Sequence, residues 1–569
     1  MSKLECSQSF NDGVMITNLS FSLTGFKITR ETRLSIVCLF IPILLSSFVH
    51  LWNPIGFPAV FVDEGHYMRR ALQVLNGHGP QESLEVYDYP YDHPYFGQII
   101  LAVLLKIVGY PDSVYSISSS SSDAPEEMIS KVERLHLVPR VLMGLFAIFD
   151  TFLIYKIAER RYNKKIAFFS SIIFAVMPIT WPLRMIVLES LLLPFLLSSL
   201  LFAVYLGDSK QKKVYRRENV IRNNKKVIAF VLISGVFLGL AVFTKVSIVS
   251  IIPAIGYVIY VNTKSLRLFF LWIIPVLAIP LIWPAYAFSI SQFNSWFEGV
   301  VYQTEREDTT FLDFLKKIFN IDPLFLILGF VAIIYAEIKR DYMILLWIVS
   351  YLVFVAIFGA NVRHFHFIVL TPILSIASAR FIIYLSDKIS SRYNSNRIQT
   401  ISLGIIASSM LAFGFVSTLS LITINLNSTY FELYAAIIAD LPQADAQEES
   451  NNIGKVTMLG HDNIRNYVWI PKYVMGKDHY SKDVHPPRFL REPIKTDNVL
   501  LIVDRKLSRD ILDQNKNGRD MIEIRSIYEN SYIVAEFKQR WPYDRNIYPY
   551  TSLRENFGIG NTVYLMTNY

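Results

Sequence analysis

Long apolar segments separated by short polar stretches are the main pattern along this chain. A membrane-spanning helix needs about 20 consecutive, mostly apolar residues. Eleven segments approach this length, near residues 34–52, 137–157, 166–183, 186–206, 227–244, 246–261, 268–289, 323–338, 342–359, 365–385 and 401–424. The pattern therefore predicts a polytopic α-helical membrane protein with about 11 transmembrane helices.

The apolar segment 96–109 is shorter and contains Lys106, which favours an interfacial or re-entrant helix over a full span. With this segment left out, the strongly basic loops all fall on one side of the membrane, at residues 159–165, 210–226, 264–267, 339–340 and 388–397. Cytoplasmic loops carry the excess of Lys and Arg. We therefore expect a cytoplasmic N-terminus and an extracytoplasmic C-terminus in a multi-pass cell membrane protein, or in the ER membrane if the source is eukaryotic.

Composition supports this interpretation and narrows the possible functions. Hydrophobic residues make up 52% of the 569 residues and charged residues only 18%, which is too apolar for a water-soluble protein of this length. The net charge of +8 comes from the basic loops, so it indicates topology and argues against nucleic-acid binding. No P-loop or paired Walker element appears, which argues against an ATP-driven pump.

The pattern divides the chain into a cytoplasmic segment 1–33, a transmembrane domain 34–424 with an outer loop 52–136, and a polar domain 425–569. Short apolar runs at 455–459, 499–503 and 532–537 predict a small α/β fold for the last domain. Cys6 and Cys38 lie outside it, so no disulfide supports it. Asn427-Ser428-Thr429 is a glycosylation sequon that agrees with the outer location, although a motif this short also arises by chance. The serine-rich stretch 116–122 predicts disorder.

Asp63 and Glu64 follow the first apolar segment, and the apolar spacing after them predicts a short amphipathic helix that begins at these carboxylates. A carboxylate at the edge of a low-dielectric region can acquire the pKa of a general base. The alternative is that Asp63 caps the helix. About thirty residues later, Tyr91 and His93 belong to an aromatic turn with a His-Pro pair, where His93 either donates to a phosphate or is an ordinary exposed side chain.

Several cations lie at the ends of spans on the predicted outer side, where the positive-inside bias does not place them. They are Arg140, Arg184, Lys245, Arg363 and His364. Such cations can hold a lipid phosphate and stabilise it as it departs, although each alone is also typical of a membrane anchor. Glu189 lies within a span and is expected to pair with Arg184, while Asp150 near the membrane centre is either functional or an interhelical hydrogen-bonding residue.

Together these residues resemble a known family. The acidic Asp63-Glu64 loop, His93-Pro94 before a short apolar helix, Arg140, Pro178 with Arg184 and Glu189, Thr244-Lys245, and Arg363 before an aromatic run with Pro372 are similar to the GT-C glycosyltransferases of family 39. That family includes the dolichyl-phosphate-mannose protein mannosyltransferases and the aminoarabinose transferases. The resemblance covers residues 34–385. Tyr95-Phe96 replace the usual Pro-Leu, and Glu189 stands where an Asp is usual.

The resemblance implies a GT-C fold and the transfer of a sugar, with mannose favoured, from a polyprenyl or dolichyl phosphate to a protein, lipid or glycan acceptor on the outer face. Asp63 matches the catalytic base and Glu64 its neighbour. His93, Arg140, Arg184, Lys245, Arg363 and His364 would bind the donor phosphate, with Glu189 and Tyr91 in supporting positions. No cofactor and no metal is expected beyond the lipid-linked sugar itself, since no His, Asp and Glu cluster has ligand spacing.

Two other classes of function fit a polytopic protein. A secondary transporter or lipid flippase would have many spans and intramembrane charges, but such proteins typically show repeated halves, and no internal repeat is visible here. A non-catalytic scaffold would use its outer domain to bind surface components, and the carboxylates would then be dispensable.

Overall fold

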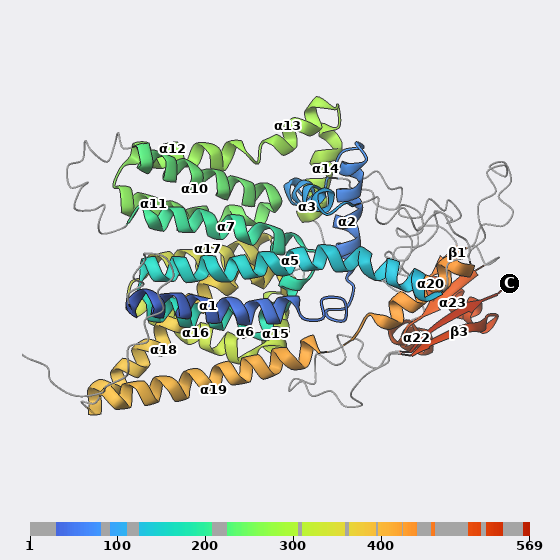
Figure 1. Cartoon of the computed structure of the whole chain (residues 1–569). Helices are drawn as coiled ribbons and strands as arrows, with labels where there is room; N and C mark the ends of the chain where they lie inside the picture. The colour runs from blue at the N-terminus through green and yellow to red at the C-terminus, as the bar shows by residue number, and fades with distance from the viewer. Residues whose placement is uncertain are drawn as a thin grey trace, which may run out of the picture.

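A computed structural model describes residues 30–80, 91–110, 125–207, 225–304, 310–358, 363–393, 396–423, 425–440, 457–460, 499–513, 519–538 and 562–568. Figure 1 shows a bundle of roughly aligned long helices with a small sheet domain at one end. The predicted N-terminal segment and the serine-rich stretch fall almost entirely outside the described residues.

Every predicted span coincides with helical structure. The helices are α1 (Arg30–Leu51), α5 (Pro125–Arg161), α6 (Lys164–Val176) with η2 (Pro178–Arg184), α7 (Leu188–Tyr205), α10 (Lys225–Thr244), η3 (Val246–Ile251) with α11 (Ile252–Thr263), α12 (Leu266–Ala278) with α13 (Ile282–Ser289), α16 (Pro323–Ile338), α17 (Tyr342–Phe358), η4 (His364–Leu370) with α18 (Thr371–Tyr393), and α19 (Asn396–Ile422). Within the described residues, seven helices are long and apolar enough to cross a membrane, or up to nine if each of two bent pairs is one span. The shorter apolar helices at 36–51 and 342–358 account for the remaining predicted spans.

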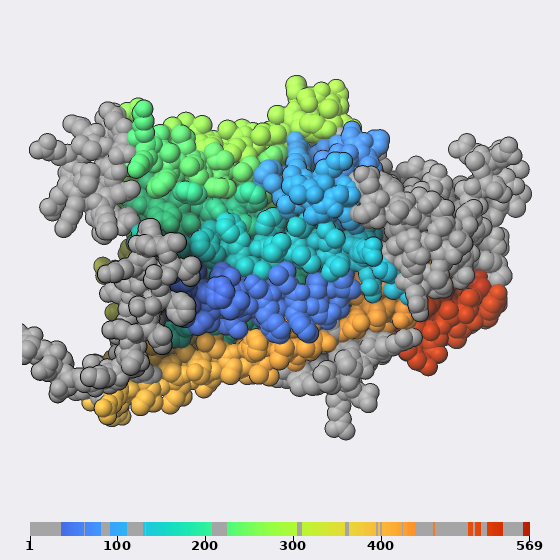
Figure 2. All heavy atoms as spheres, viewed as in Figure 1, coloured from blue at the N-terminus to red at the C-terminus, as the bar shows by residue number. Residues whose placement is uncertain are grey.

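The outer surface of the bundle is apolar, as a membrane solvent requires. α1, α5 and α19 share the face seen in Figure 2. Large hydrophobic side chains are exposed on two of these helices, Phe40 on α1 and Ile405 on α19 among them. The membrane-protein prediction is confirmed at the level of the fold.

Two spans are bent. α6 and η2 meet at a bend of 68°, and Pro178 begins η2. The helix α15 (Phe311–Ile321), which lies between two predicted spans, meets α16 at 118°. Asp322 lies at this second bend and accepts a hydrogen bond from the Phe325 amide at 2.9 Å, so it caps α16. Proline lacks an amide donor and therefore tends to begin helices rather than continue them.

The two ends of the bundle have different structures. At one end lie the short helices α2 (Val62–Leu75), α3 (Phe96–Ile107) and α14 (Phe293–Thr304), together with the sheet domain (Figure 1). At the other end, Asp341 between α16 and α17 forms an ion pair with Arg380 of α18, accepts a hydrogen bond from Tyr162 at 2.7 Å, and lies 3.9 Å from Arg161. This Asp341 cluster ties the α5–α6 connection to α17 and α18.

The C-terminal domain contains a four-stranded sheet of order β1-β2-β4-β3 among the described residues. β1 (Thr457–Leu459) pairs parallel with β2 (Val499–Val503), while β4 (Thr562–Thr567) pairs antiparallel with both β2 and β3 (Tyr532–Lys538). β4 was not predicted. β2 is buried on both faces. On one face, Leu501 packs with α22 (Arg505–Leu512) and α23 (Arg519–Glu529). On the other face, Leu500 belongs to the main core, on the side of α20 (Ser428–Asp440). Burial on both faces explains its uninterrupted apolar sequence.

Close approach of two helices depends on small residues in α10. A Cβ atom added to Gly235 would lie 2.4 Å from the Trp272 carbonyl oxygen, and one added to Gly239 would lie 2.5 Å from the Pro275 carbonyl oxygen. Both contacts are with the backbone of α12, which cannot move aside as a flexible side chain does. The pair of glycines thus forms a small-xxx-small interface between α10 and α12.

Gly239→Ala should therefore force α10 and α12 apart. Overpacking of this kind costs about 1–3 kcal/mol, so the apparent melting temperature in detergent should fall. Gly404→Ala is the matched control, because a Cβ there meets nothing within 4 Å. An equal effect of the two substitutions would contradict the proposed close packing.

Candidate functional site

α2 begins at the predicted carboxylates. Phe61 is the residue that precedes the helix, and its amide donates to Glu64 Oε2 at 2.9 Å. This is the return hydrogen bond of a capping box, in which the third helical residue reaches back to the start of the helix. The alternative that Asp63 caps α2 is therefore wrong, since the capping contact comes from Glu64.

Glu64 forms a buried ion pair with Arg140 of α5. Arg140 Nη2 lies 2.6 Å from Oε2 and Nε lies 3.0 Å from Oε1, and both side chains are fully buried. Oε1 also accepts the amide of Ile186 at 3.0 Å. Burial by itself would raise the pKa of Glu64, but the Arg140 guanidinium and these hydrogen bonds lower it. Glu64 is thus held ionised, and both of its carboxylate oxygens accept hydrogen bonds. This favours a structural role over the predicted catalytic one.

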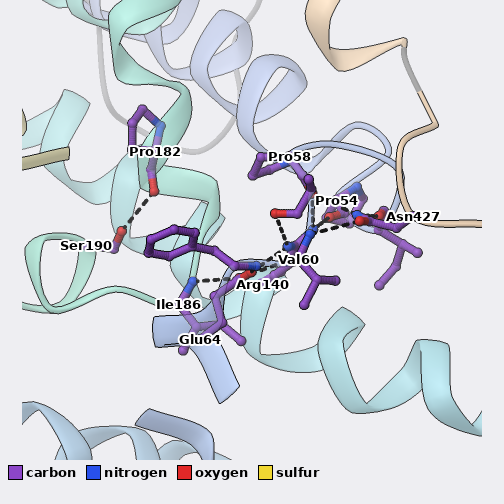
Figure 3. A network of polar contacts seen from close by, with 12 residues as sticks. Pro54, Pro58, Val60, Glu64, Arg140, Pro182, Ile186, Ser190 and Asn427 are labelled. Atoms are coloured by element: carbon purple, nitrogen blue, oxygen red, sulfur yellow. Dashed lines mark hydrogen bonds and ion pairs between the residues drawn. The ribbon is translucent and has the colours of Figure 1, made fainter. Parts of the chain in front are cut away.

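Arg140 also organises the chain that leads into α2. Its Nη1 donates to the carbonyl oxygens of Pro54 at 2.9 Å and Pro58 at 2.8 Å (Figure 3). We call residues 52–61 the site loop. Because the guanidinium is buried and its donors are committed to Glu64 and these carbonyls, the geometry favours a structural role for Arg140 over the predicted phosphate-binding one.

Arg184 holds the beginning of the same loop. It is fully buried, and its Nη2 donates to the carbonyl oxygens of Trp52 and, at 2.9 Å, Asn53. The predicted pair with Glu189 is wrong. The chain between them is extended at Met185 and Val187, so the two side chains do not lie on one helical face. Arg184 therefore joins η2 to the site loop rather than to the intramembrane carboxylate.

Glu189 pairs instead with another predicted cation. The Lys245 ammonium, between α10 and η3, donates to Glu189 Oε1 in the first turn of α7, and both side chains are mostly buried. His366 Nε2 lies 4.0 Å from the same oxygen. Sequence reasoning missed His366, although it follows His364 by two residues in the same aromatic run.

Arg363 and His364 begin η4 beside the site loop. The Arg363 guanidinium lies 5.1 Å from the centre of the Phe61 ring, and among the described residues no carboxylate forms an ion pair with it. The His364 ring lies 4.9 Å from the ring of Trp181, and its buried Nε2 has no hydrogen-bond partner in the described part of the chain. Both predicted residues thus retain donor groups that could contact an anion.

The remaining predicted residues meet around Tyr67, which is buried one helical turn after Asp63. The pKa of Tyr67 is raised well above its ordinary value, first by burial and then by the nearby carboxylates of Asp63, Glu189 and Asp92. His93 is close enough to both Asp92 and His366 to interact with them electrostatically. Asp63, Asp92 and Glu189 thus lie near Tyr67, and His93 lies near His366.

The His-Pro turn is anchored from two sides. Arg70 Nη1 of α2 lies 2.8 Å from Asp92 Oδ1, and His66 Nε2 lies 3.6 Å from Oδ2. Although burial alone would raise the pKa of Asp92, the neighbouring Arg70, His93 and His66 hold it well below its usual range. On the other side, the Tyr91 hydroxyl donates to Gln292 Oε1 at 2.7 Å, which ties the turn to the residue before α14.

Other polar groups lie apart from this region. Asp150 is buried in α5, and neither of its carboxylate oxygens has a hydrogen-bond partner among the described residues. Among all the residues that the structure describes, no group of three His, Cys, Asp or Glu side chains is arranged to hold a metal ion.

Glu64→Gln should leave the Arg140 charge buried without a counter-ion. Removing one partner of a buried pair costs about 3–5 kcal/mol, so the apparent melting temperature of the purified protein should fall strongly. Glu337→Gln removes an exposed carboxylate from α16 and is the control. Unchanged melting of Glu64→Gln would exclude the structural role.

Stability should also depend on the protonation of His66. Burial and the neighbouring Arg70 lower the pKa of His66 to about 4, against the opposing effect of Asp92 and with a smaller contribution from Arg69. In an unfolded chain the pKa is about 6.5. Between these values the unfolded chain binds a proton that the folded chain does not, so the free energy of unfolding falls as pH falls.

His66→Gln should therefore reduce the loss of apparent melting temperature between about pH 7 and about pH 5. His78→Gln, at an exposed histidine shortly after α2, should show the wild-type dependence. Identical pH dependence in wild type and His66→Gln would rule out a contribution from His66.

Comparison with known proteins finds similarity in structure only. The sequence matches no protein-family model and no curated protein. The fold matches the oligosaccharyltransferase of Archaeoglobus fulgidus tethered with an acceptor peptide (TM-score 0.52, 13% identity, 91% of this chain and 74% of that chain). It also matches ArnT from Cupriavidus metallidurans in the apo state, with a TM-score of 0.52 and 11% identity over 94% of this chain and 98% of that chain. For ArnT bound to undecaprenyl phosphate, the TM-score is 0.50 and the identity 13%, over 93% of this chain and 97% of that chain.

The match to ArnT extends over nearly the whole of both chains. The chain spans 61% to 75% of the length of the Archaeoglobus oligosaccharyltransferase chains that it matches. These proteins are GT-C glycosyltransferases. The expected GT-C architecture is thus confirmed at the level of the fold.

Proposed function

We propose that this protein is a membrane glycosyltransferase that takes a sugar from a polyprenyl phosphate. The observation that carries the proposal is the meeting of Asp63 and His93 with Arg363, Lys245 and His366 at one end of an apolar bundle. A carboxylate that accepts a proton beside cations that hold an anion is the arrangement that phosphate departure from a sugar needs. The structurally similar ArnT is described as binding undecaprenyl phosphate, which supports this donor class.

Asp63 is the proposed base, and its neighbour Glu64 is not. The two side chains leave α2 in directions about 100° apart. Glu64 points to Arg140 and is fully buried, whereas Asp63 is half-buried and faces the Tyr67 side. Adjacent carboxylates therefore have separate tasks in this proposal, one holding α2 in place and one acting as the base.

The reaction follows an inverting displacement. Asp63 accepts the proton of the acceptor hydroxyl or amide while the acceptor atom forms a bond to the anomeric carbon. The bond from that carbon to the phosphate oxygen breaks, and the electron pair leaves with the lipid phosphate. Arg363 and His364 stabilise the charge on the departing phosphate, and Lys245, paired with Glu189, lines the same region.

The sugar and acceptor follow from the family resemblance, which favours mannose and admits a protein, lipid or glycan acceptor. We place the site on the outer face of the membrane. The basic loop residues Arg160, Lys164 and Lys339 lie at the opposite end of the bundle, and such loops favour the cytoplasm.

Asp63→Asn should reduce transfer from a radiolabelled polyprenyl-phosphate sugar in proteoliposomes by about 10²–10⁴-fold, the usual contribution of a general base. Its apparent melting temperature should stay near wild type, in contrast to Glu64→Gln.

Arg363→Ala should reduce the rate of sugar transfer by about 10²–10³-fold, as when one stabilising donor is removed. Arg267→Ala, an exposed arginine at the other end of the bundle, is its control.

Full turnover by Asp63→Asn would remove Asp63 from the mechanism. Wild-type proteoliposomes that translocate lipid or solute but transfer no sugar would overturn the transferase proposal in favour of a transporter.

A further inference from the structure

Asn427 lies within a glycosylation sequon, yet its side chain is fully buried. Its Nδ2 donates to the carbonyl oxygens of Ile55 at 2.6 Å and Pro58 at 2.7 Å, and its Oδ1 accepts the amide of Val60 at 2.8 Å (Figure 3). Both amide hydrogens are thus committed. A glycan on Nδ2 would replace one of these hydrogens and would need space that the fold does not have, which disfavours a glycan at this sequon in the folded protein.

The contacts of Asn427 are to the backbone of the site loop. This loop has no regular secondary structure, so its buried carbonyl and amide groups need partners from elsewhere. Arg140 and Arg184 can only donate, whereas the Asn427 amide supplies both donors and an acceptor. Leu426 adds a backbone hydrogen bond to the Gly56 carbonyl oxygen at 2.7 Å. The segment just before α20 therefore completes the hydrogen bonding of the loop.

The far end of the site loop sets the position of the reacting groups. Val60, which Asn427 holds, is followed by Phe61, and Phe61 precedes the first residue of α2. The Phe61 ring lies under the Arg363 guanidinium at 5.1 Å and against the Phe365 ring at 5.8 Å. Asp63 follows two residues later, so a shift of Val60 would move both the proposed base and the aromatic support of the proposed phosphate ligand.

α20 connects this contact to the C-terminal domain. It packs against α5 on one side and against β3 and β4 on the other. Asn427 immediately precedes α20, so its side chain joins the extracytoplasmic domain to the site loop, 367 positions away from Val60 in sequence.

We propose that Asn427 is a positioning residue that sets the place of Asp63 and Phe61 through the site loop, and that its sequon carries no glycan in the native fold. The inference rests on the proposed transferase function for its kinetic part only. It assigns to the C-terminal segment a direct structural contribution to the reaction.

The first experiment compares Asn427→Ala with Thr429→Val. Both destroy the sequon, but only Asn427→Ala removes the three contacts to the site loop. A displacement of about 1 Å at reacting groups can cost about 100-fold in rate. Asn427→Ala should therefore lower kcat at least about tenfold with KM for the polyprenyl-phosphate sugar changed by no more than about twofold. Thr429→Val should keep wild-type kcat.

Hydrogen exchange measured by mass spectrometry tests the contact without any assay of activity. Peptides that cover residues 52–61 should be protected in the wild type and in Thr429→Val, and should exchange faster in Asn427→Ala. If the wild type transfers no sugar while this pattern is observed, the proposed function fails and the attachment of the loop by Asn427 stands. If Asn427→Ala leaves the loop protected, the positioning proposal is overturned whatever the activity.

Asn427→Asp separates hydrogen bonding from packing. The carboxylate form cannot donate to Ile55 and Pro58, but its protonated form can donate to one of them, and burial raises the pKa of a carboxyl group. The transfer rate of Asn427→Asp relative to wild type should rise as pH is lowered, whereas the relative rate of Asn427→Ala should stay constant. Flat ratios for both variants, equal losses in Thr429→Val and Asn427→Ala, or a glycan on Asn427 of the folded wild type would each overturn the proposal.

Discussion

A buried guanidinium, that of Arg140, is the point on which the local structure of the site depends. A charge without water needs a counter-ion and a full set of hydrogen-bond acceptors. Glu64 supplies the first, and the carbonyl oxygens of Pro54 and Pro58 supply part of the second. The same contacts fix the start of α2 against α5, so the electrostatic need of one side chain determines where α2 lies.

Residues with similar chemistry consequently have different tasks. Arg140 and Arg184 are buried and bind the site loop, whereas Arg363 lies on an aromatic ring without an ion-pair partner among the described residues. Glu64 and Asp63 divide in the same way. Charge and position at a span end do not distinguish these cases, because the distinction is made by which groups surround each side chain.

The positions of most helices and strands were predictable from the sequence. Hydropathy located every span, the helical spacing after Asp63 located α2, and apolar runs located β1, β2 and β3. These features depend on local composition and periodicity, which can be recognised in a short stretch of sequence. The bends at Pro178 and at Asp322 were missed because a window average does not register a change of direction within an apolar run.

The pairings of the site could not be predicted in the same way. Glu189 lies 56 positions from its partner Lys245, and Glu64 lies 76 positions from Arg140. The nearer pairing of Glu189 with Arg184 was preferred from sequence proximity, but three-dimensional packing reversed it. His366 could have been found from the sequence, because it is the second histidine within residues 363–367. The role of Asn427 could not, because it depends on a contact with Val60, 367 positions away.

The Asp341 cluster has a mechanical consequence for the whole bundle. It joins the α5–α6 connection to α17 and α18 at the end remote from Asp63. Helices fastened together at one end can separate further at the other, so movement of α17 and α18 away from α5 and α6 is restricted most at Asp341.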